Sequence, residues 1–296
     1  MTSEGENGRY RVETAAPLPS YDDEAPFKDS IDRPRMNRPT PRTPRQPSAA
    51  PPPQRFSDKA EARSAVWKAL VENRVARFPF PLKGRIPNFA GADRASARLL
   101  EHPAFGNAKC VKVNPDSPQR YVRKSLLDRG ITVITPTPRL QGGFFRLDPY
   151  GIPKQHYWDA ASMKMGGRWG EPVGLDQLPS IDVIAMGCVA VTRDGRRLGK
   201  GHGYADLEYA ILRELGHPAV PVVTTVHALQ ILEEFPTEPH DVPVSIIATP
   251  GELIEITQPP PAPSGIDWDM LPLEALAEMP ILAELKSLVG VRSARA

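Results

Sequence analysis

Residues 181–216, IDVIAMGCVAVTRDGRRLGKGHGYADLEYAILRELG, contain the three parts that decide the fold. The run 181–191 is a long apolar stretch, which predicts a strand buried on both faces of a sheet. Residues 206–215 predict a helix, and Gly216 follows them as a helix-ending residue. A glycine-rich turn joins the two. Strand, turn and helix in this order predict an α/β unit.

The turn is rich in glycine and positive charge. Gly199, Gly201 and Gly203 alternate along it, and glycine permits positive φ and a close approach of backbone N–H groups to an anion. The N-terminus of the following helix adds the positive end of its dipole. The cations of the turn are Arg196, Arg197 and Lys200. We expect a phosphate-binding turn; the alternative is a mobile turn with solvated charges.

The turn matches neither of two common nucleotide motifs. A Walker A loop has four residues between its glycines and Ser or Thr after its lysine. Here three residues separate Gly195 from Gly199, and Gly201 follows Lys200. For the dinucleotide fingerprint, the third glycine comes one residue too early.

Two further residues of the turn have two interpretations each. Asp206 lies at the start of the helix, where its negative charge interacts favourably with the helix dipole. Alternatively, it is a ligand for the Mg²⁺ that accompanies a nucleotide. Tyr204 stacks on a ligand ring or packs against the sheet.

Strands and helices alternate over the rest of the central region. We expect strands at 108–113, 131–136, 220–226 and 244–249 and helices at 91–100 and 118–129, the latter closed by Gly130. A first helix is capped by Ser57 or Asp58 and has an apolar face of Ala62, Val66, Leu70 and Val71. The predicted fold class is α/β, a mostly parallel sheet with helices on both faces.

The chain divides by composition. Of its 35 prolines, eleven precede residue 55, so residues 1–55 are expected to be a disordered Pro/Arg-rich tail that is either solvated or a docking arm. Residues 56–257 form the α/β domain. Residues 258–265 (QPPPAPSG) form a linker, and residues 266–296 are expected to form two short docked helices.

Composition also limits the functional classes. The net charge of +2 does not indicate a nucleic-acid binder. Cys110 and Cys188 lie in apolar stretches, which favours buried reduced thiols. The sequence has no run of about 18 apolar residues and no secretory signal at the N-terminus, so we expect a cytoplasmic protein without a membrane span.

Two residues lie at predicted strand ends. Asn114 and Arg139 follow the strands at 108–113 and 131–136, and open α/β sheets bind ligands at the carboxyl ends of their strands. We expect them to contact substrate, although ordinary turn chemistry also explains the Asn and Pro residues there. His227 and His240 also lie near strand ends and are interpreted as structural, since no cluster has zinc spacing.

The segment from Asp194 to Asp206 resembles the glycine-rich signature of the 5-formyltetrahydrofolate cyclo-ligase (methenyltetrahydrofolate synthetase) family. Other short elements resemble the same family over roughly residues 57–250: Lys59 with Arg63, Tyr150-Gly-Ile-Pro153, and His240-Asp241. The segments that resemble the branch of methenyltetrahydrofolate synthetase domain-containing proteins are Arg85–Ala92, Asn114–Asp116 with Pro118-Gln119, Gly199–Tyr209, Trp268 and Met279–Leu282.

The resemblance implies a fold of the ribose-isomerase and CoA-transferase type, with ATP and Mg²⁺ as cofactors. It implies phosphoryl transfer to the formyl oxygen of 5-formyltetrahydrofolate, assisted by Lys200 and Arg197, with Asp206 as metal ligand. The residues that it implies for nucleotide binding are Lys59, Arg63, Gly199, Lys200, Gly201, His202, Gly203 and Tyr204. Tyr204 is also expected to contact substrate, with Asn114 and Arg139.

The sequence departs from the family on the folate side. Ala205 replaces a tyrosine, Leu207 an arginine, and Lys154 a common glutamate. Three functions therefore remain open: a cyclo-ligase acting on 5-formyltetrahydrofolate, an enzyme with the same phosphoryl chemistry on another substrate, and a non-enzymatic module that binds nucleotide or folate.

Overall fold

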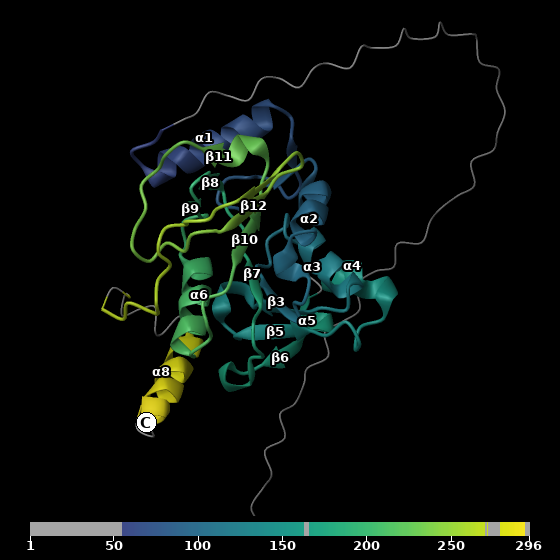
Figure 1. The fold of residues 1–296 in the computed structure, drawn as a ribbon, viewed down its shortest axis with the longest axis vertical. Helices are drawn as coiled ribbons and strands as arrows, with labels where there is room; N and C mark the ends of the chain where they lie inside the picture. Colours follow the sequence, from purple (N-terminus) through teal and green to yellow (C-terminus); the bar gives the residue numbers. More distant parts are fainter. Residues whose placement is uncertain (1–54, 163–165, 270, 272–278, 294–296) are drawn as a thin grey trace, which may run out of the picture. The chain divides into compact units, whose positions relative to one another are not determined.

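The computed structural model describes residues 55–162, 166–269, 271 and 279–293 (Figure 1). Its main feature is an eight-stranded sheet with the strand order β13-β12-β10-β7-β3-β4-β5-β6. The bounds in chain order are β3 Cys110–Val113, β4 Thr132–Pro136, β5 Phe144–Leu147, β6 Glu171–Val173, β7 Val183–Ala185, β10 Val222–Thr225, β12 Ile246–Ala248 and β13 Leu253–Glu255.

The five central strands are parallel. The pairs β12–β10, β10–β7, β7–β3 and β3–β4 are all parallel, whereas β13, β5 and β6 are attached antiparallel at the two edges. Strands β3 and β7 lie at the centre, with Val111 opposite Val183. Their residues are buried on both sides, as parallel strands covered by helices are. The prediction of a mostly parallel sheet is confirmed.

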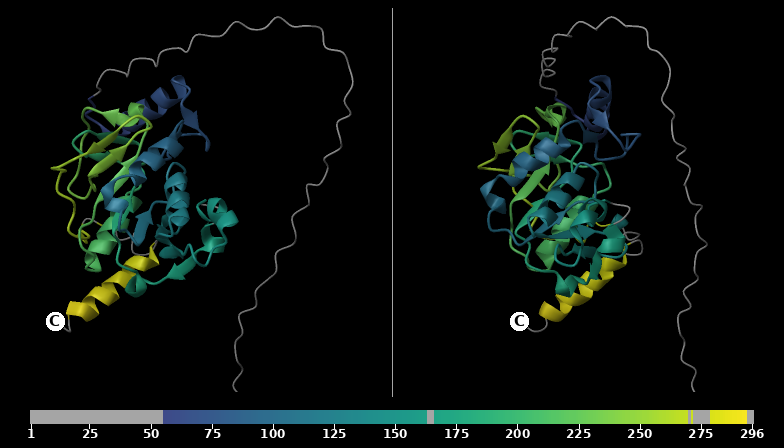
Figure 2. Two further views of the ribbon diagram at one scale, coloured as in Figure 1. Left: turned by 45° about the vertical axis from the view of Figure 1, so that its right-hand side comes forward. Right: turned by 90° about the vertical axis from the view of Figure 1, so that its right-hand side faces the viewer.

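Helices cover both faces of this sheet. One face packs against α2 (Ala92–Leu100), α3 (Arg120–Asp128) and α4 (Tyr157–Ala160). The other packs against α6 (Tyr204–Glu214) and α8 (Pro280–Ser293). Side chains along β3 alternate between the two cores: Val111 and Val113 join the first, Cys110 the second. Helix α1 lies at one end of the domain and α8 at the opposite end (Figure 2).

The prediction of one strand over 181–191 is wrong. The run divides into β7, in the main sheet, and β8 (Ala190–Thr192), in a three-stranded sheet with β9 (Arg197–Leu198) and β11 (Ile231–Leu232). Both halves are buried, and a continuous apolar run cannot reveal a bend between two buried strands. Gly187 lies at the division, where a Cβ atom would be 2.9 Å from Gln119 Oε1.

The first helix forms as predicted. Helix α1 spans Lys59–Glu72, and the Asp58 carboxylate accepts hydrogen bonds from the N–H groups of residues 60 and 61. Ala62, Val66 and Leu70 are buried in a third core beside β8, but Val71 is 53% exposed and does not belong to the apolar face. Three short elements lie outside these sheets: β1 Ala76–Arg77 pairs with β2 Asn88–Phe89, and α5 spans Gly166–Trp169. Short 3₁₀ helices span Pro103–Phe105, Pro138–Leu140, Lys154–His156, Leu175–Gln177 and Ala228–Gln230.

The other predicted elements are found with small shifts at their ends. The helix predicted at 206–215 begins two residues earlier, at Tyr204, because Gly203 already adopts the left-handed conformation of its N-cap. Helix α8 packs into the second core through Leu282 and Leu285. Residues 270, 272–278 and 294–296 of the predicted C-terminal segment and residues 1–54 of the tail predicted at 1–55 lie outside the described residues. Arg55, the last residue of the predicted tail, is described and forms a β-bridge with Glu234.

The cysteines match the expectation of free thiols. Cys110 and Cys188 are buried and form no disulfide. Burial raises the pKa of Cys110 to about 12 and that of Cys188 to about 11. In the described part of the chain, no helix has both the length and the apolar composition needed to cross a bilayer.

Candidate functional site

The glycine-rich turn connects β9 to the N-terminus of α6. Gly201 and Gly203 have φ of 103° and 70°, values that L side chains rarely adopt. Gly203 is the N-cap of α6 and has no capping side chain, so free N–H groups of the first helical turn point outward. These features position the turn to receive an anion.

Gly195 has a different role from the other glycines of this segment. Its φ is 96°, and a Cβ atom there would lie 2.4 Å from the Val244 carbonyl oxygen. The two backbones are also hydrogen-bonded, since Val244 N donates to Gly195 O at 2.8 Å. Gly195 therefore permits a close approach of two backbone segments, and the open part of the turn begins at Gly199.

Helix α1 contributes a cation to the turn. Arg63 Nε donates to the carbonyl oxygen of Gly199 at 2.7 Å, and its guanidinium carbon would lie 3.4 Å from a Cβ atom at Gly201. Partial burial lowers the pKa of Arg63, although the nearby carboxylates act to raise it. The structure thus brings Arg63 to the turn, 136 residues away in sequence.

The second predicted cation of α1 lies beside the turn. Lys59 Nζ contacts Asp241 Oδ2 at 2.7 Å and Glu238 Oε2 at 3.0 Å. Burial lowers the pKa of Lys59, but its hydrogen bonds to these carboxylates outweigh burial and the pKa is raised. With His240, the two carboxylates form a group whose ligand atoms lie within 4.8 Å of one another.

Arg197 is buried beneath the turn. It is 2% exposed, its Nη2 bonds Asp206 Oδ1, and its Nε donates to the Val242 carbonyl at 3.0 Å. Burial lowers the pKa of Arg197, and the Asp206 carboxylate more than offsets this effect, so that the pKa is raised. Arg197 Nη1 has no hydrogen-bond partner within the described ranges and would lie 3.2 Å from a Cβ atom at Gly199.

Asp206 joins α6 to the segment that follows Asp241. Its Oδ1 accepts from Arg197 and, at 2.9 Å, from Val242 N. No described residue donates to Oδ2, and the side chain is 13% exposed. A free carboxylate oxygen in the first turn of a helix suits a hard cation such as Mg²⁺. Asp241, one residue from Val242, is a site residue that the sequence analysis did not assign.

Lys200 bridges the turn to the loop after β3. Its Nζ lies 3.2 Å from Asp116 Oδ1, and its side chain is 34% exposed. No role was predicted for Asp116 from the sequence, where the signals in this loop were its turn chemistry and the resemblance of Asn114–Asp116 to the branch. His202 and Tyr204 are the remaining predicted residues of the turn; their rings are 6.1 Å apart. His202 is exposed, and Tyr204 is half-buried against the second core.

Two of the three predicted substrate residues, Asn114 and Arg139, follow neighbouring strands. Asn114 follows β3 directly and is 2% exposed; its Nδ2 donates to Glu208 Oε2 at 2.8 Å. Arg139 lies in a 3₁₀ helix, Pro138–Leu140, after β4, but its side chain is outside the described set. Both backbones are at the carboxyl edge of the sheet, as predicted.

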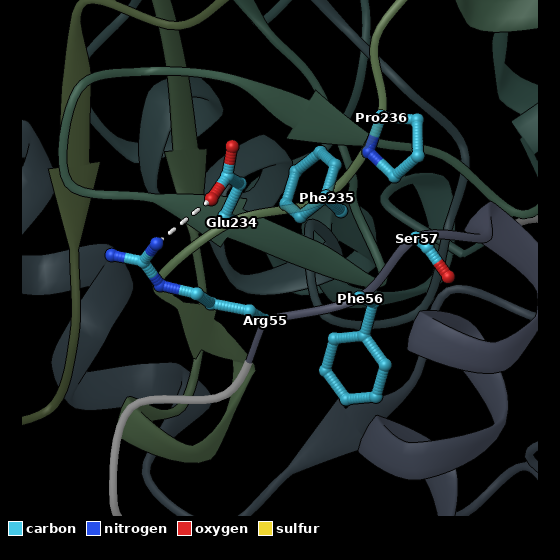
Figure 3. Close-up of a pocket in the computed structure, with 6 residues that line it drawn as sticks. All are labelled: Arg55, Phe56, Ser57, Glu234, Phe235 and Pro236. Carbon is cyan, nitrogen blue, oxygen red and sulfur yellow. Dashed lines mark ion pairs between the residues drawn. The ribbon is translucent and has the colours of Figure 1, made fainter.

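A pocket of about 540 Å³ lies elsewhere, at the N-terminal end of α1 (Figure 3). Arg55 reaches Glu234 across it at 3.5 Å, and its other lining residues are Phe56, Ser57, Phe235 and Pro236. The pocket is wide open to solvent and contains none of the predicted site residues. The candidate site is therefore the group around the N-terminus of α6.

The comparisons with known proteins agree with the resemblance found in the sequence. A methenyltetrahydrofolate synthase domain-containing protein of Mus musculus is 39% identical over 234 residues, which cover 77% of this chain and 63% of the mouse protein. A 5-formyltetrahydrofolate cyclo-ligase of Mycolicibacterium smegmatis is 32% identical over 136 residues, 43% of this chain and 63% of that protein.

A solved structure of the 5,10-methenyltetrahydrofolate synthetase of Aquifex aeolicus covers 68% of this chain, with a TM-score of 0.43 and 18% identity. The chain spans less than two thirds of the length of the curated relatives it matches. The model of the 5-formyltetrahydrofolate cyclo-ligase family matches residues 57–250, around the site described above. This chain belongs to the 5-formyltetrahydrofolate cyclo-ligase family.

Proposed function

We propose that the domain is an ATP- and Mg²⁺-dependent cyclo-ligase that converts 5-formyltetrahydrofolate to 5,10-methenyltetrahydrofolate. The formyl oxygen takes the γ-phosphoryl group of ATP, and N10 then bonds the formyl carbon. Phosphate leaves with the former formyl oxygen, and the N10 proton leaves with it. The products are the methenyl compound, ADP and phosphate. The observation that carries the proposal is the glycine turn at the positive end of α6, reached by Arg63.

The phosphate half of the site has cations at three depths. Lys200 is partly exposed, Arg63 is half-buried, and Arg197 is buried with Nη1 free below Gly199. Charge that develops on a transferring phosphoryl group is stabilised by positioned donors of this kind, with no covalent role for the protein. Lys59 completes the set on α1. Its ammonium group contacts both Asp241 and Glu238.

The metal is assigned to Asp206. Its Oδ1 is held by Arg197 and Val242 N, so that Oδ2 remains for a cation, and Asp241 lies in the adjoining segment. When bound there, Mg²⁺ would neutralise part of the charge on the transferring phosphoryl group. Arg197 then has two functions: it orients the carboxylate through Nη2 and offers Nη1 to a phosphate oxygen.

The substrate half is assigned to the carboxyl edge of β3 and β4. Asn114 and Arg139 follow these strands, and Tyr204 adjoins the turn from α6. Lys200 joins the two halves through Asp116. An arriving phosphate competes with Asp116 for the same ammonium group, because both are anions within reach of Lys200.

The proposal is tested by turnover of the purified chain. Mg-ATP and 5-formyltetrahydrofolate are mixed with the protein, and the methenyl product is followed by its absorbance. Product formation that depends on ATP and Mg²⁺ and falls in the Lys200→Ala variant is the expected result. A wild-type chain that forms no methenyl product, or that does not bind 5-formyltetrahydrofolate, would contradict the proposal.

A second candidate is the same phosphoryl chemistry on another substrate. It is favoured by Ala205 and Leu207 next to the metal ligand, where the family has a tyrosine and an arginine. ATP binding without the methenyl product would support it over the first, and binding without any turnover would favour a nucleotide-binding module.

The reduced, buried Cys110 and Cys188 support a cytoplasmic location.

A further inference from the structure

A buried ion pair joins the central strand to the helix of the glycine turn. Lys112 of β3 is 0% exposed, and its Nζ bonds Glu208 Oε2 of α6, which is 4% exposed. Lysine is almost never fully buried unless it is paired. Buried pairs of this kind are often replaceable by apolar residues without loss of stability. Stability alone therefore does not account for a lysine in the middle of this sheet.

The same glutamate oxygen holds Asn114. Asn114 Nδ2 donates to Glu208 Oε2 at 2.8 Å, beside the bond from Lys112. Burial raises the pKa of Glu208, and Lys112 opposes this effect. A carboxylate paired with an ammonium group accepts hydrogen bonds but does not donate them. Glu208 thus requires the NH₂ group of Asn114 on its own side, and the carbonyl oxygen Oδ1 faces away from it.

Asn114 Oδ1 lacks a hydrogen-bond donor within the described part of the chain. The atom is buried, and none of the residues that the structure describes donates a hydrogen bond to it. A buried acceptor without a donor is costly and uncommon. Gln119 Oε1 in the same loop is also buried, and no described residue donates a hydrogen bond to it. An orientation that leaves such an oxygen free is explained if a ligand supplies the missing donor.

The surroundings of Asn114 belong to the candidate site. Asn114 follows the carboxyl end of β3, and Asp116 of the same loop contacts Lys200 of the glycine turn. Beside them, at the end of β7, a Cβ atom on Gly187 would lie 2.9 Å from Gln119 Oε1 and 3.1 Å from Asp116 Oδ2. Oxygen acceptors therefore gather at the edge where an open α/β sheet binds ligands.

We propose that Lys112 and Glu208 are positioning residues that fix the Asn114 amide, so that its carbonyl oxygen accepts a hydrogen bond from an N–H group of the substrate ring. The assignment rests on the proposed function: a reduced pteridine has several N–H donors. The pair also ties β3, which positions the substrate, to α6, which positions the phosphate. Lys112 does not touch either ligand, because it is enclosed between sheet and helix.

The first test is Glu208→Gln, which keeps the shape and lets the Asn114 amide turn either way. The KM for 5-formyltetrahydrofolate is expected to rise roughly two- to tenfold, the value of one hydrogen bond, while the KM for ATP stays within about twofold. Asn114→Ala should give the same rise. The KM for 5-formyltetrahydrofolate of the variant with both substitutions should exceed that of Asn114→Ala by less than about twofold, because the glutamate acts through the amide. Glu171→Gln, in an exposed pair with Arg146, is the matched control.

A second variant separates positioning from folding. Lys112→Met with Glu208→Leu removes both charges together, and its melting temperature is expected to equal or exceed that of the wild type. It should nevertheless show the raised KM for 5-formyltetrahydrofolate. An unchanged KM for 5-formyltetrahydrofolate in Glu208→Gln, or additive effects of Glu208→Gln and Asn114→Ala on this KM, would overturn the inference. The proposed function would still stand in that case, provided that the wild-type chain turns over 5-formyltetrahydrofolate. A wild-type chain that does not bind 5-formyltetrahydrofolate in calorimetry would overturn both.

Discussion

Replacement of Lys200 by alanine tests the phosphate site directly. In the structure, Lys200 Nζ is 3.2 Å from Asp116 Oδ1, and its side chain is about one-third exposed, at 34%. A bound phosphate would take the place of this carboxylate. Two unit charges about 4 Å apart interact by about 4 kcal/mol at an effective dielectric constant of about 20, and by about 1 kcal/mol in bulk water.

Because Lys200 is partly exposed, the energy between its ammonium group and a bound phosphate lies toward the lower of these values. The contact with Asp116 that the phosphate displaces offsets part of this energy. We expect a net loss of about 1–2 kcal/mol, which raises the Kd for Mg-ATP roughly five- to thirtyfold. The free energy of unfolding should also fall, by roughly 1 kcal/mol, because the Asp116 side chain is only 14% exposed and loses its ion-pair partner.

Isothermal titration of Mg-ATP at low ionic strength measures the effect. Between about 0.1 M and 1 M salt the Debye length falls from about 10 Å to about 3 Å, so the difference between wild type and variant should shrink. Lys124→Ala is a matched control, because Lys124 is 39% exposed and pairs with Asp128 on α3. A Kd for Mg-ATP that is the same in Lys200→Ala and wild type at low salt would refute the assignment of the turn as a phosphate site.

Three further predictions concern stability and reactivity. Gly203→Ala should lower the free energy of unfolding by about 1–2 kcal/mol, the cost of a left-handed backbone alone, because no atom lies within 4 Å of its Cβ position. Gly195→Ala should lower it further, because a backbone carbonyl oxygen would be 2.4 Å from the new Cβ atom. Chemical denaturation measures both losses of stability, and equal losses would contradict this ranking. Burial lowers the pKa of His227 below 6.5, so the unfolded chain binds the proton more readily and stability is lost as pH falls below about 6.5. In His227→Gln, the free energy of unfolding should therefore depend less on pH between pH 7 and 5 than it does in the wild type. The same pH dependence in both proteins would count against this prediction. Since burial raises the thiol pKa values of Cys110 and Cys188 to about 12 and about 11, the folded protein should react with a disulfide reagent at pH 8 far more slowly than the denatured chain, and equal rates would be inconsistent with burial.

The secondary structure was largely predictable from local pattern. Helix α2 was predicted at 91–100 and lies at Ala92–Leu100, and β4 was predicted at 131–136 and lies at Thr132–Pro136. Glycine and proline mark the ends of these elements, and their apolar residues have the period of a helix or a strand. The division of 181–191 was not predictable, because both of its strands are buried and leave the same apolar signature.

The candidate site was predictable in part. The glycine turn has a local signature, so Gly199 to Asp206 could be identified without a structure, and the resemblance to a family added Lys59 and Arg63. The burial of Arg197 and its bond to Asp206 were not predictable, since a run of two arginines has the appearance of a solvated surface. Nor were Asp116 and Glu208 predictable as partners of the turn and of β3.

The sequence by itself determined the class of fold and predicted an anion-binding turn, because hydrophobic period, glycine spacing and helix order act between residues close in the chain. The tertiary structure alone decided which charges meet. Lys200 contacts Asp116 across 84 residues, and Lys112 contacts Glu208 across 96. Such pairs leave no periodic trace in the chain, because parallel strands joined by helices bring their carboxyl ends together only when the sheet has formed.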